Sequence, residues 1–111
     1  MKASELKKKI HGGALKEYAR LYANTDAQET RFSRIIDSFT SFYGDKESCI
    51  LSVPGRSEIS GNHTDHNHGC VLAGAIDRDV IAVAAKNDLG LVRFFSEGYP
   101  EGEIKVSPKS L

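Results

Sequence analysis

The sequence predicts an α+β fold in which N-terminal helices precede a mixed or antiparallel sheet. Up to Tyr43, apolar residues recur every three or four positions, and from Cys49 onward they form short runs rich in β-branched residues. Helices followed by a series of strands are typical of α+β proteins, whereas strict alternation would indicate an α/β fold. The 111 residues suffice for one domain with one core.

We therefore expect a single domain over residues 1–111, helical over 1–45 and mainly β over 49–111. Two short helices are expected first, at 4–10 and 14–23, because Gly12 and Gly13 interrupt the apolar stripe between them.

A stronger helix follows. Thr25 or Asp26 is expected to cap it, with Gln28 or Glu29 three residues later completing a capping box. Its stripe of aromatic residues is expected to lie in the core, and Gly44 is expected to end it with a left-handed conformation.

The strands are predicted from shorter signals. A first strand is expected to stop at Pro54, and the run DVIAVAAK is expected to be a strand buried on both faces. Asn87-Asp88-Leu89-Gly90 is typical of a hairpin turn, so the strand after it is expected to return alongside. The expected β segments are 49–53, 56–60, 79–86, 91–96 and 104–106.

Composition excludes several classes of protein. Lys plus Arg and Asp plus Glu both number 15, and this balance argues against a nucleic-acid binder. The start, MKASELKKKI, lacks the apolar stretch of a secretory signal, and apolar runs such as 80–85 are far too short to cross a bilayer. Cys49 and Cys70 are expected to be reduced thiols of a cytoplasmic protein.

Residues 53–79 concentrate polar side chains between apolar runs, and a functional site is expected there. Pro54-Gly55 is expected to form a rigid turn that holds Arg56. A guanidinium held in this way can grip an anionic oxygen with two hydrogen bonds. Gly61 is expected to let the backbone approach a ligand closely.

Asn62, His63, Asp65 and His66 then place donors and acceptors within five residues. One carboxylate can accept from two adjacent hydroxyl groups, so this pattern suits a polyhydroxylated ligand. Three interpretations compete: a polar turn whose groups cap one another, a metal site that also uses His68, and a sugar or phosphate site. The spacing matches no helical or zinc-finger metal motif, so no metal is expected.

The stretch PGRSEISGNHTDHNHGCVLAGAID closely resembles the galactokinase signature, which reads approximately GR-x-N-L-I-G-E-H-x-D-Y-N-x-G before a V-L-P-x-A-I-D-like run. Galactokinases belong to the GHMP kinases. The resemblance covers about residues 53–86 without a gap, and the strands as far as Ser96 fit the N-terminal half of the family more loosely.

The resemblance implies roles for matching positions. Arg56 corresponds to the arginine near the anomeric hydroxyl and the transferred phosphoryl group, and is the expected catalytic residue. His63 and Asp65 correspond to sugar-contacting positions. Asn62 stands where the family usually has Glu, and is expected to contact the sugar through its amide. Glu58 and His66 also depart from the usual Asn and Tyr.

The family's phosphate loop and its catalytic aspartate have no counterpart in these 111 residues. The resemblance therefore implies the N-terminal, sugar-binding piece of a kinase that phosphorylates galactose with ATP and magnesium, a piece that is inactive alone and binds no cofactor. A catalytically silent sugar sensor, or a sibling kinase acting on N-acetylgalactosamine, are the alternatives. Self-association through Val80, Ile81, Val83 or Phe94 is also expected.

Overall fold

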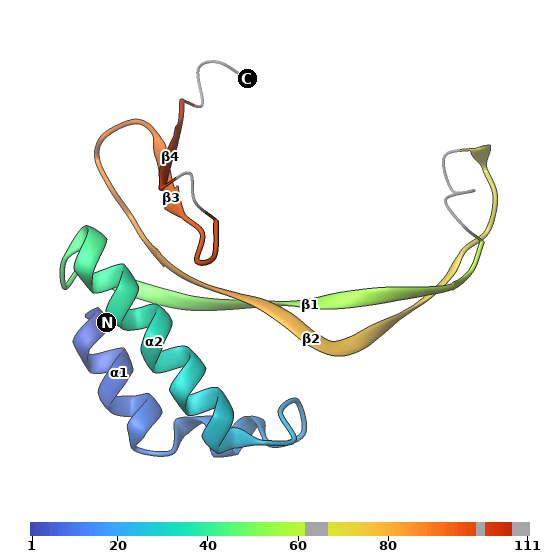
Figure 1. The fold of residues 1–111 in the computed structure, drawn as a ribbon, viewed down its shortest axis with the longest axis horizontal. Coiled ribbons are helices and arrows are strands. Elements are labelled where there is room, and N and C mark those ends of the chain that lie inside the picture. Colours follow the sequence, from blue (N-terminus) through green and yellow to red (C-terminus); the bar gives the residue numbers. More distant parts are fainter. Residues whose placement is uncertain (62–66, 100–101, 108–111) are drawn as a thin grey trace.

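The computed structural model describes residues 1–61, 67–99 and 102–107. Helices come first and antiparallel strands follow, so the predicted α+β class is confirmed (Figure 1). The elements are α1 (Ala3–His11), the 3-10 helix η1 (Ala14–Tyr18), α2 (Thr25–Tyr43), β1 (Ser48–Ser60), β2 (Leu72–Ala85), β3 (Val92–Phe95) and β4 (Glu103–Val106).

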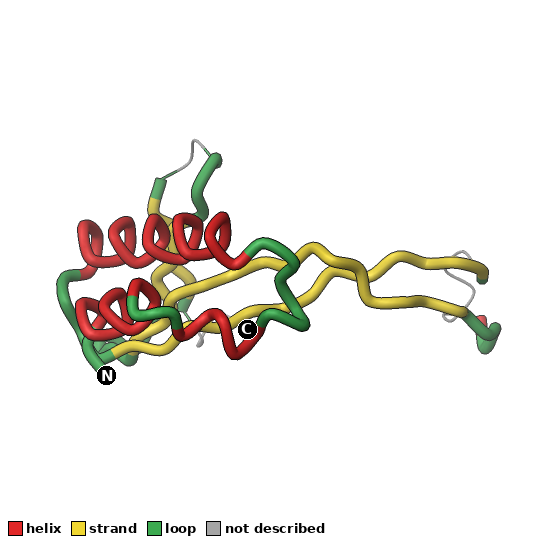
Figure 2. Tube along the Cα trace, turned by 90° about the horizontal axis from the view of Figure 1, so that it is seen from below, coloured by secondary structure: helices red, strands yellow, loops and turns green. Residues whose placement is uncertain are grey.

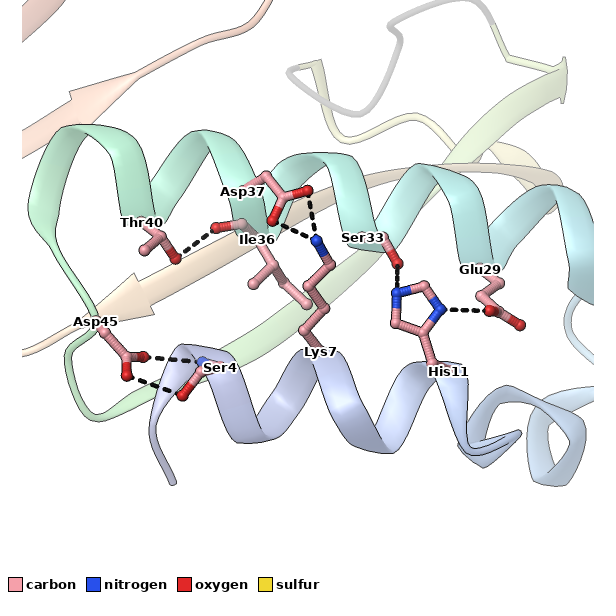
Figure 3. Close-up of polar contacts among 9 residues, drawn as sticks. All are labelled: Ser4, Lys7, His11, Glu29, Ser33, Ile36, Asp37, Thr40 and Asp45. Carbon is pink, nitrogen blue, oxygen red and sulfur yellow. Dashed lines mark hydrogen bonds and ion pairs between the residues drawn. The ribbon is translucent and has the colours of Figure 1, made fainter.

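Helices α1 and α2 lie antiparallel and are joined by polar contacts along their length (Figure 3). At one end, the backbone N–H and the hydroxyl of Ser4 both donate to Asp45, each at 2.8 Å. Lys7 Nζ donates to both Asp37 oxygens, at 2.6 and 2.7 Å. At the other end, His11 Nδ1 donates to Glu29 Oε1 at 2.6 Å. These contacts fix how the two helices align.

The core lies between the helices and one face of the β1–β2 ribbon. Ile36 is its most buried large side chain, at 1% exposure. The aromatic stripe of α2 lies in this core, as predicted, although Phe42 is half exposed. The buried apolar residues are Ala3, Ile10, Leu15, Phe32, Ile36, Phe39 and Ile81.

The antiparallel register of β1 and β2 assigns the two faces of the ribbon. Ile50 lies opposite Val83 and Ser52 lies opposite Ile81, and these pairs face the helices. The alternate pairs point away from the helices, and Val80 among them is 73% exposed. We call this second surface the open face; it comprises Cys49, Leu51, Val53, Val80, Ala82 and Ala84. The prediction that DVIAVAAK is buried on both faces is therefore wrong.

Two further strand predictions are wrong. Pro54 does not end the first strand, because β1 continues through it to Ser60. The turn at 87–90 does not return the chain alongside β2, because β3 pairs with β4 in a separate two-stranded sheet. The predicted strands at 91–96 and 104–106 themselves are present, as β3 and β4.

Contacts with α2 account for the position of β3. The rings of Phe95 and Phe42 lie 4.3 Å apart between centroids, and the Arg93 guanidinium lies 5.4 Å above the Tyr43 ring. Ser38 also donates to Glu97, which follows β3, at 2.6 Å. This aromatic and polar surface of α2 holds the second hairpin near the helices (Figure 1).

The predictions for the helices agree with the structure better than those for the strands. The break at Gly12-Gly13 is confirmed, but the segment expected at 14–23 is only the short 3-10 helix η1. The cap of α2 is Asn24 rather than Thr25 or Asp26; its backbone is extended, and its side-chain oxygen accepts from Ala27 N at 3.0 Å. Gly44 ends α2 as expected, but its φ of 81° and ψ of 175° do not form the left-handed conformation that was predicted.

Among the helices of the described residues, none is long and apolar enough to cross a membrane.

Candidate functional site

The outer part of the β1–β2 ribbon carries the segment in which the sequence predicts the site. Both strands extend well beyond the helices (Figures 1 and 2). We call residues 56–60 and 72–75 the distal arm. It presents Arg56 on β1 opposite Ala75 on β2, and the Arg56 residue is exposed. The arm thus holds the signature segment away from the hydrophobic core.

The base of the distal arm is irregular. Pro54 pairs with Asp79, but Arg56 pairs with Ala75, so three residues of β2, 76–78, lie opposite the single Gly55. Such bulges bend a ribbon and change the direction in which the following side chains point. The expected Pro54-Gly55 turn is therefore wrong: both residues belong to β1, and the irregularity lies in the partner strand.

Gly55 is needed for space at this bulge. A Cβ added there would lie 3.2 Å from the carbonyl oxygen of Arg78 and 3.2 Å from the side chain of Ile76. Its φ is not positive, so the expected special backbone conformation is absent at this residue. A side chain would fit here only if Arg78 and Ile76 shifted by a few tenths of an ångström.

Gly61 lies at the far end of the arm, where it packs closely against the backbone of Cys70 and Val71. Its φ is +115°, and an added Cβ would lie 2.7 Å from Val71 Cα and 2.8 Å from the Cys70 carbonyl oxygen. The close approach at Gly61 is thus between the two sides of the hairpin, and the predicted approach to a ligand stays a prediction.

The remaining predicted site residues, Asn62, His63 and Asp65, lie outside the described residues, as does His66. The structure therefore places Arg56 and the two strand ends that flank residues 62–66. Whether Arg56 and Asp65 share one site stays a prediction.

A polar cluster that the sequence did not single out lies at the inner side of the bulge, around Asp79. The Asp79 side chain is only 11% exposed. Its Oδ2 accepts from Ser52 Oγ at 2.6 Å and from the Tyr22 hydroxyl at 2.8 Å. Arg31 Nη1 forms an ion pair with Oδ1, and Arg31 Nη2 donates to the Asp79 main-chain oxygen at 2.8 Å. We call these four residues the Asp79 cluster.

These contacts change the acid–base properties of the cluster. Burial by itself favours the neutral carboxyl, but hydrogen bonds from Ser52, Arg31 and Tyr22 and the charge of Arg31 outweigh it and lower the pKa of Asp79. Burial, together with the neighbouring Asp79 carboxylate, raises the pKa of the Tyr22 hydroxyl. Asp79 is therefore an anion at neutral pH that α2, β1 and the segment before α2 all hold.

Sequence reasoning missed this cluster because its members lie far apart in the chain. One signal was available: Asp79 opens an otherwise apolar strand, and a charge in such a position needs partners when it is buried. Which cation would reach it depends on how α2 lies against the ribbon, and the sequence does not specify that packing.

The described surface includes two hollows near the helices. One, of about 480 Å³, lies between the segment before α2 and the bulge, and is lined by Tyr22, Ala23, Asn24, Gln28, Ile76, Asp77 and Arg78. The other, of about 450 Å³, runs along α2 and is lined by His11, Glu29, Thr30, Ser33, Arg34, Asp37 and Ser38. Arg56 lines neither of these hollows, and the other predicted site residues lie outside the described part of the chain.

Comparison with known proteins gives an independent result for this part of the chain. Residues 37–86 match the family model of the galactokinase galactose-binding signature. The galactokinase of Enterococcus faecalis is 35% identical over 78 residues, which are 69% of this chain and 20% of that protein. The galactokinase of Dictyostelium discoideum is 29% identical over 92 residues, covering 78% of this chain and 18% of that protein.

A third relative, the galactokinase of Bacillus subtilis, is 37% identical over 68 residues, which are 60% of this chain and 17% of that protein. The chain thus spans about a fifth of the length of these curated relatives. No solved structure matches it significantly. The resemblance drawn from the motif is confirmed: residues 37–86 carry the galactose-binding signature of the galactokinases, and the chain is related to part of those enzymes.

Proposed function

We propose that this chain is the sugar-binding portion of a galactokinase-type enzyme, which transfers a phosphoryl group from ATP to the anomeric hydroxyl of galactose with the help of Mg²⁺. The observation that carries the proposal is the galactose-binding signature over residues 37–86. The geometry agrees with it, because Arg56 of that signature is exposed on an arm that projects from the core.

Each signature residue has a proposed role. Arg56 lies near the anomeric oxygen, where its guanidinium offsets the negative charge that develops during phosphoryl transfer. Asp65 accepts hydrogen bonds from ring hydroxyls, and His63 and Asn62 complete the contacts with the sugar. In this kind of reaction, catalysis consists largely of positioning and electrostatic stabilisation, so a correctly aimed arginine has a large effect.

The chain alone is proposed to bind galactose without phosphorylating it. A triphosphate needs a nest of backbone N–H groups, and these 111 residues contain no run of the family's phosphate-loop type. ATP and Mg²⁺ are accordingly assigned to the longer enzyme. ATP-dependent phosphorylation of galactose by the purified chain would contradict this part of the proposal.

Galactose binding is tested by calorimetric titration of the purified chain with galactose and with glucose, its C4 epimer. We expect measurable binding of galactose and loss of that binding in Arg56→Ala. Arg20→Ala, which removes an exposed arginine outside the signature, is the matched control and should bind as the wild type does. Equal binding by Arg56→Ala and the wild type would remove Arg56 from the site.

One observation favours a second candidate, a silent sugar sensor. Asn62 stands where the family usually has a glutamate, and an amide brings donors and no charge to the sugar. Kinetics on the longer gene product that contains this chain distinguish the two functions. Turnover with galactose supports the kinase, turnover only with N-acetylgalactosamine supports a sibling kinase, and sugar binding without turnover supports the sensor.

A further inference from the structure

The Asp79 cluster lies where the direction of the distal arm is determined. Pro54 and Asp79 form the last regular pair before residues 76–78 bulge opposite Gly55. Beyond that point the ribbon extends past the helices (Figures 1 and 2). Asp79 is therefore the last residue of β2 in regular register on the inner side of the bulge.

Arg31 holds both the side chain and the main chain of Asp79. One guanidinium nitrogen pairs with the carboxylate and another donates to the main-chain oxygen of the same residue. Because the guanidinium is planar and presents its donors in a rigid fork, these two bonds fix the orientation of the peptide as well as its position. Gln28 Oε1 accepts from Arg31 Nη1 at 3.1 Å and steadies the fork from one turn earlier on α2.

The same carboxylate also ties in β1. Ser52 is two residues before Pro54, and its hydroxyl donates to Asp79 Oδ2. Ser52 and Pro54 lie two residues apart on β1, just before the register shift between Pro54 and Arg56. The cluster thus clamps both strands immediately inside the bulge, two positions before Arg56.

We propose that Arg31, acting through Asp79, is a positioning residue that sets the direction in which the distal arm presents Arg56. Nothing in this role requires Arg31 to touch the sugar. Its consequence for sugar binding rests on the proposed function, whereas its effect on the arm does not.

The arm is tested with the two native cysteines, which are exposed and lie on either side of the bulge, Cys49 in the base and Cys70 past the tip. Nitroxide labels on both allow pulsed electron paramagnetic resonance to measure the distribution of their separation. We expect a narrow distribution for the wild type and one about twofold broader for Arg31→Gln. Arg34→Gln is the matched control, because Arg34 lies on the same helix and pairs with Glu97 instead.

Equal widths for Arg31→Gln and Arg34→Gln, with both proteins folded by circular dichroism, would overturn the proposal. If Arg31→Gln does not fold, Tyr22→Phe replaces it, since that change removes one hydrogen bond to Asp79 and keeps the aromatic ring. A smaller broadening is expected for Tyr22→Phe, and an unchanged width would count against the proposal in the same way.

Galactose titration of the same variants separates positioning from simple stabilisation. At a temperature where all variants are folded, Arg31→Gln should bind galactose about tenfold more weakly, since small misplacements of a binding group are costly. Arg31→Lys should not restore affinity, because an ammonium does not reproduce the two-pronged grip. A broadened arm with unchanged affinity would refute the effect on the sugar site. Failure of the wild type to bind galactose would count against the proposed function, while the label distances still decide the role of Arg31.

Discussion

Gly61 combines a φ of +115° with no room for a side chain, whereas Gly90 has a positive φ of +66° and no atom within 4 Å of an added Cβ. Substitution of Gly90 would therefore measure the free-energy cost of a positive φ alone, whereas substitution of Gly61 would add the cost of a steric clash. The packing of Gly61 against Val71 and the open space around Gly90 are visible only in the structure.

We predict that Gly61→Ala destabilises the fold by more than about 3 kcal/mol, because strain at a positive φ and steric overlap with backbone atoms add together. Gly90→Ala should cost only about 1 kcal/mol, the cost of the left-handed conformation itself. Urea unfolding followed by circular dichroism measures both values. Equal costs for the two substitutions would show that the hairpin adjusts around Gly61.

The lowered pKa of Asp79 predicts how the stability of the fold depends on pH. Its pKa is lower in the folded chain than its ordinary value of 3.8, so its ionised form stabilises the fold at neutral pH. That stabilisation is fully present above the unfolded-state pKa and is lost as the pH falls through the lower folded-state pKa. Asp45 and Glu103 also have lowered pKa values, so several carboxylates act in the same acid range.

We predict that Asp79→Asn costs about 2 kcal/mol at pH 7, the usual contribution of hydrogen bonds to a charged group. The difference between the variant and the wild type should shrink as the pH falls below about 4. Urea unfolding at a series of pH values measures it, and comparison with the wild type cancels the contributions of Asp45 and Glu103. A difference that stayed constant down to pH 2 would contradict the role of the charge.

At the scale of elements, α2 organises the molecule. One side of it faces α1 through the Lys7–Asp37 and His11–Glu29 contacts (Figure 3). Its C-terminal part contacts β3 through Phe42 and Phe95. Its N-terminus adjoins the hollow next to the bulge. The start of this helix therefore influences both the core and the base of the arm.

We predict that Asn24→Ala destabilises the chain by about 1 kcal/mol, because the N–H of Ala27 loses the side-chain oxygen that caps it. Asn24→Ser should recover most of this loss, since serine is also a good cap. Thr25→Ala is the comparison that tests the cap predicted from sequence, and it should have a smaller effect. Thermal unfolding measures all three, and a larger loss for Thr25→Ala would favour the sequence-based assignment.

At the scale of the whole molecule, the open face is the feature that lacks a covering layer among the described residues. Leu51, Val53 and Val80 lie on it and are each more than half exposed. A contiguous apolar surface on a ribbon with open edges favours association with other surfaces. Two of the residues expected in such contacts do not belong there, because Ile81 is buried and Val83 packs against the core.

We predict that the chain self-associates through the open face, and that Val80→Lys reduces this association by placing a charge on that face. Leu89→Lys is the matched control, since Leu89 is an exposed leucine in the turn after β2. Sedimentation over a range of concentrations measures the effect. A wild-type chain that stays monomeric at high concentration would rule this prediction out.

The periodicity of the sequence correctly predicted the features that depend only on residues close together along the chain. The break at Gly12-Gly13, the extent of α2 and its end at Gly44 follow from local spacing and backbone freedom, and the structure agrees. The signature around Arg56 could also be recognised from the sequence, because it consists of particular residue types at fixed spacing within one continuous stretch. Local signals of this kind act over a few residues, which is why they survive without knowledge of the packing.

The pairing of the strands and the partners of Asp79 depend on contacts between segments far apart in the sequence. Pro54 was expected to end a strand, yet the bulge in β2 accommodates it within β1. The turn after β2 was expected to make a hairpin with β2, yet β3 packs on α2, where the ring of Phe95 contacts the ring of Phe42. The partners of Asp79 likewise come from separate segments. The sequence by itself thus determined α1, α2, the fold class and the signature. Strand pairing, the bulge and the Asp79 cluster arise only when segments far apart in the chain meet, since their energies depend on packing that no local pattern contains.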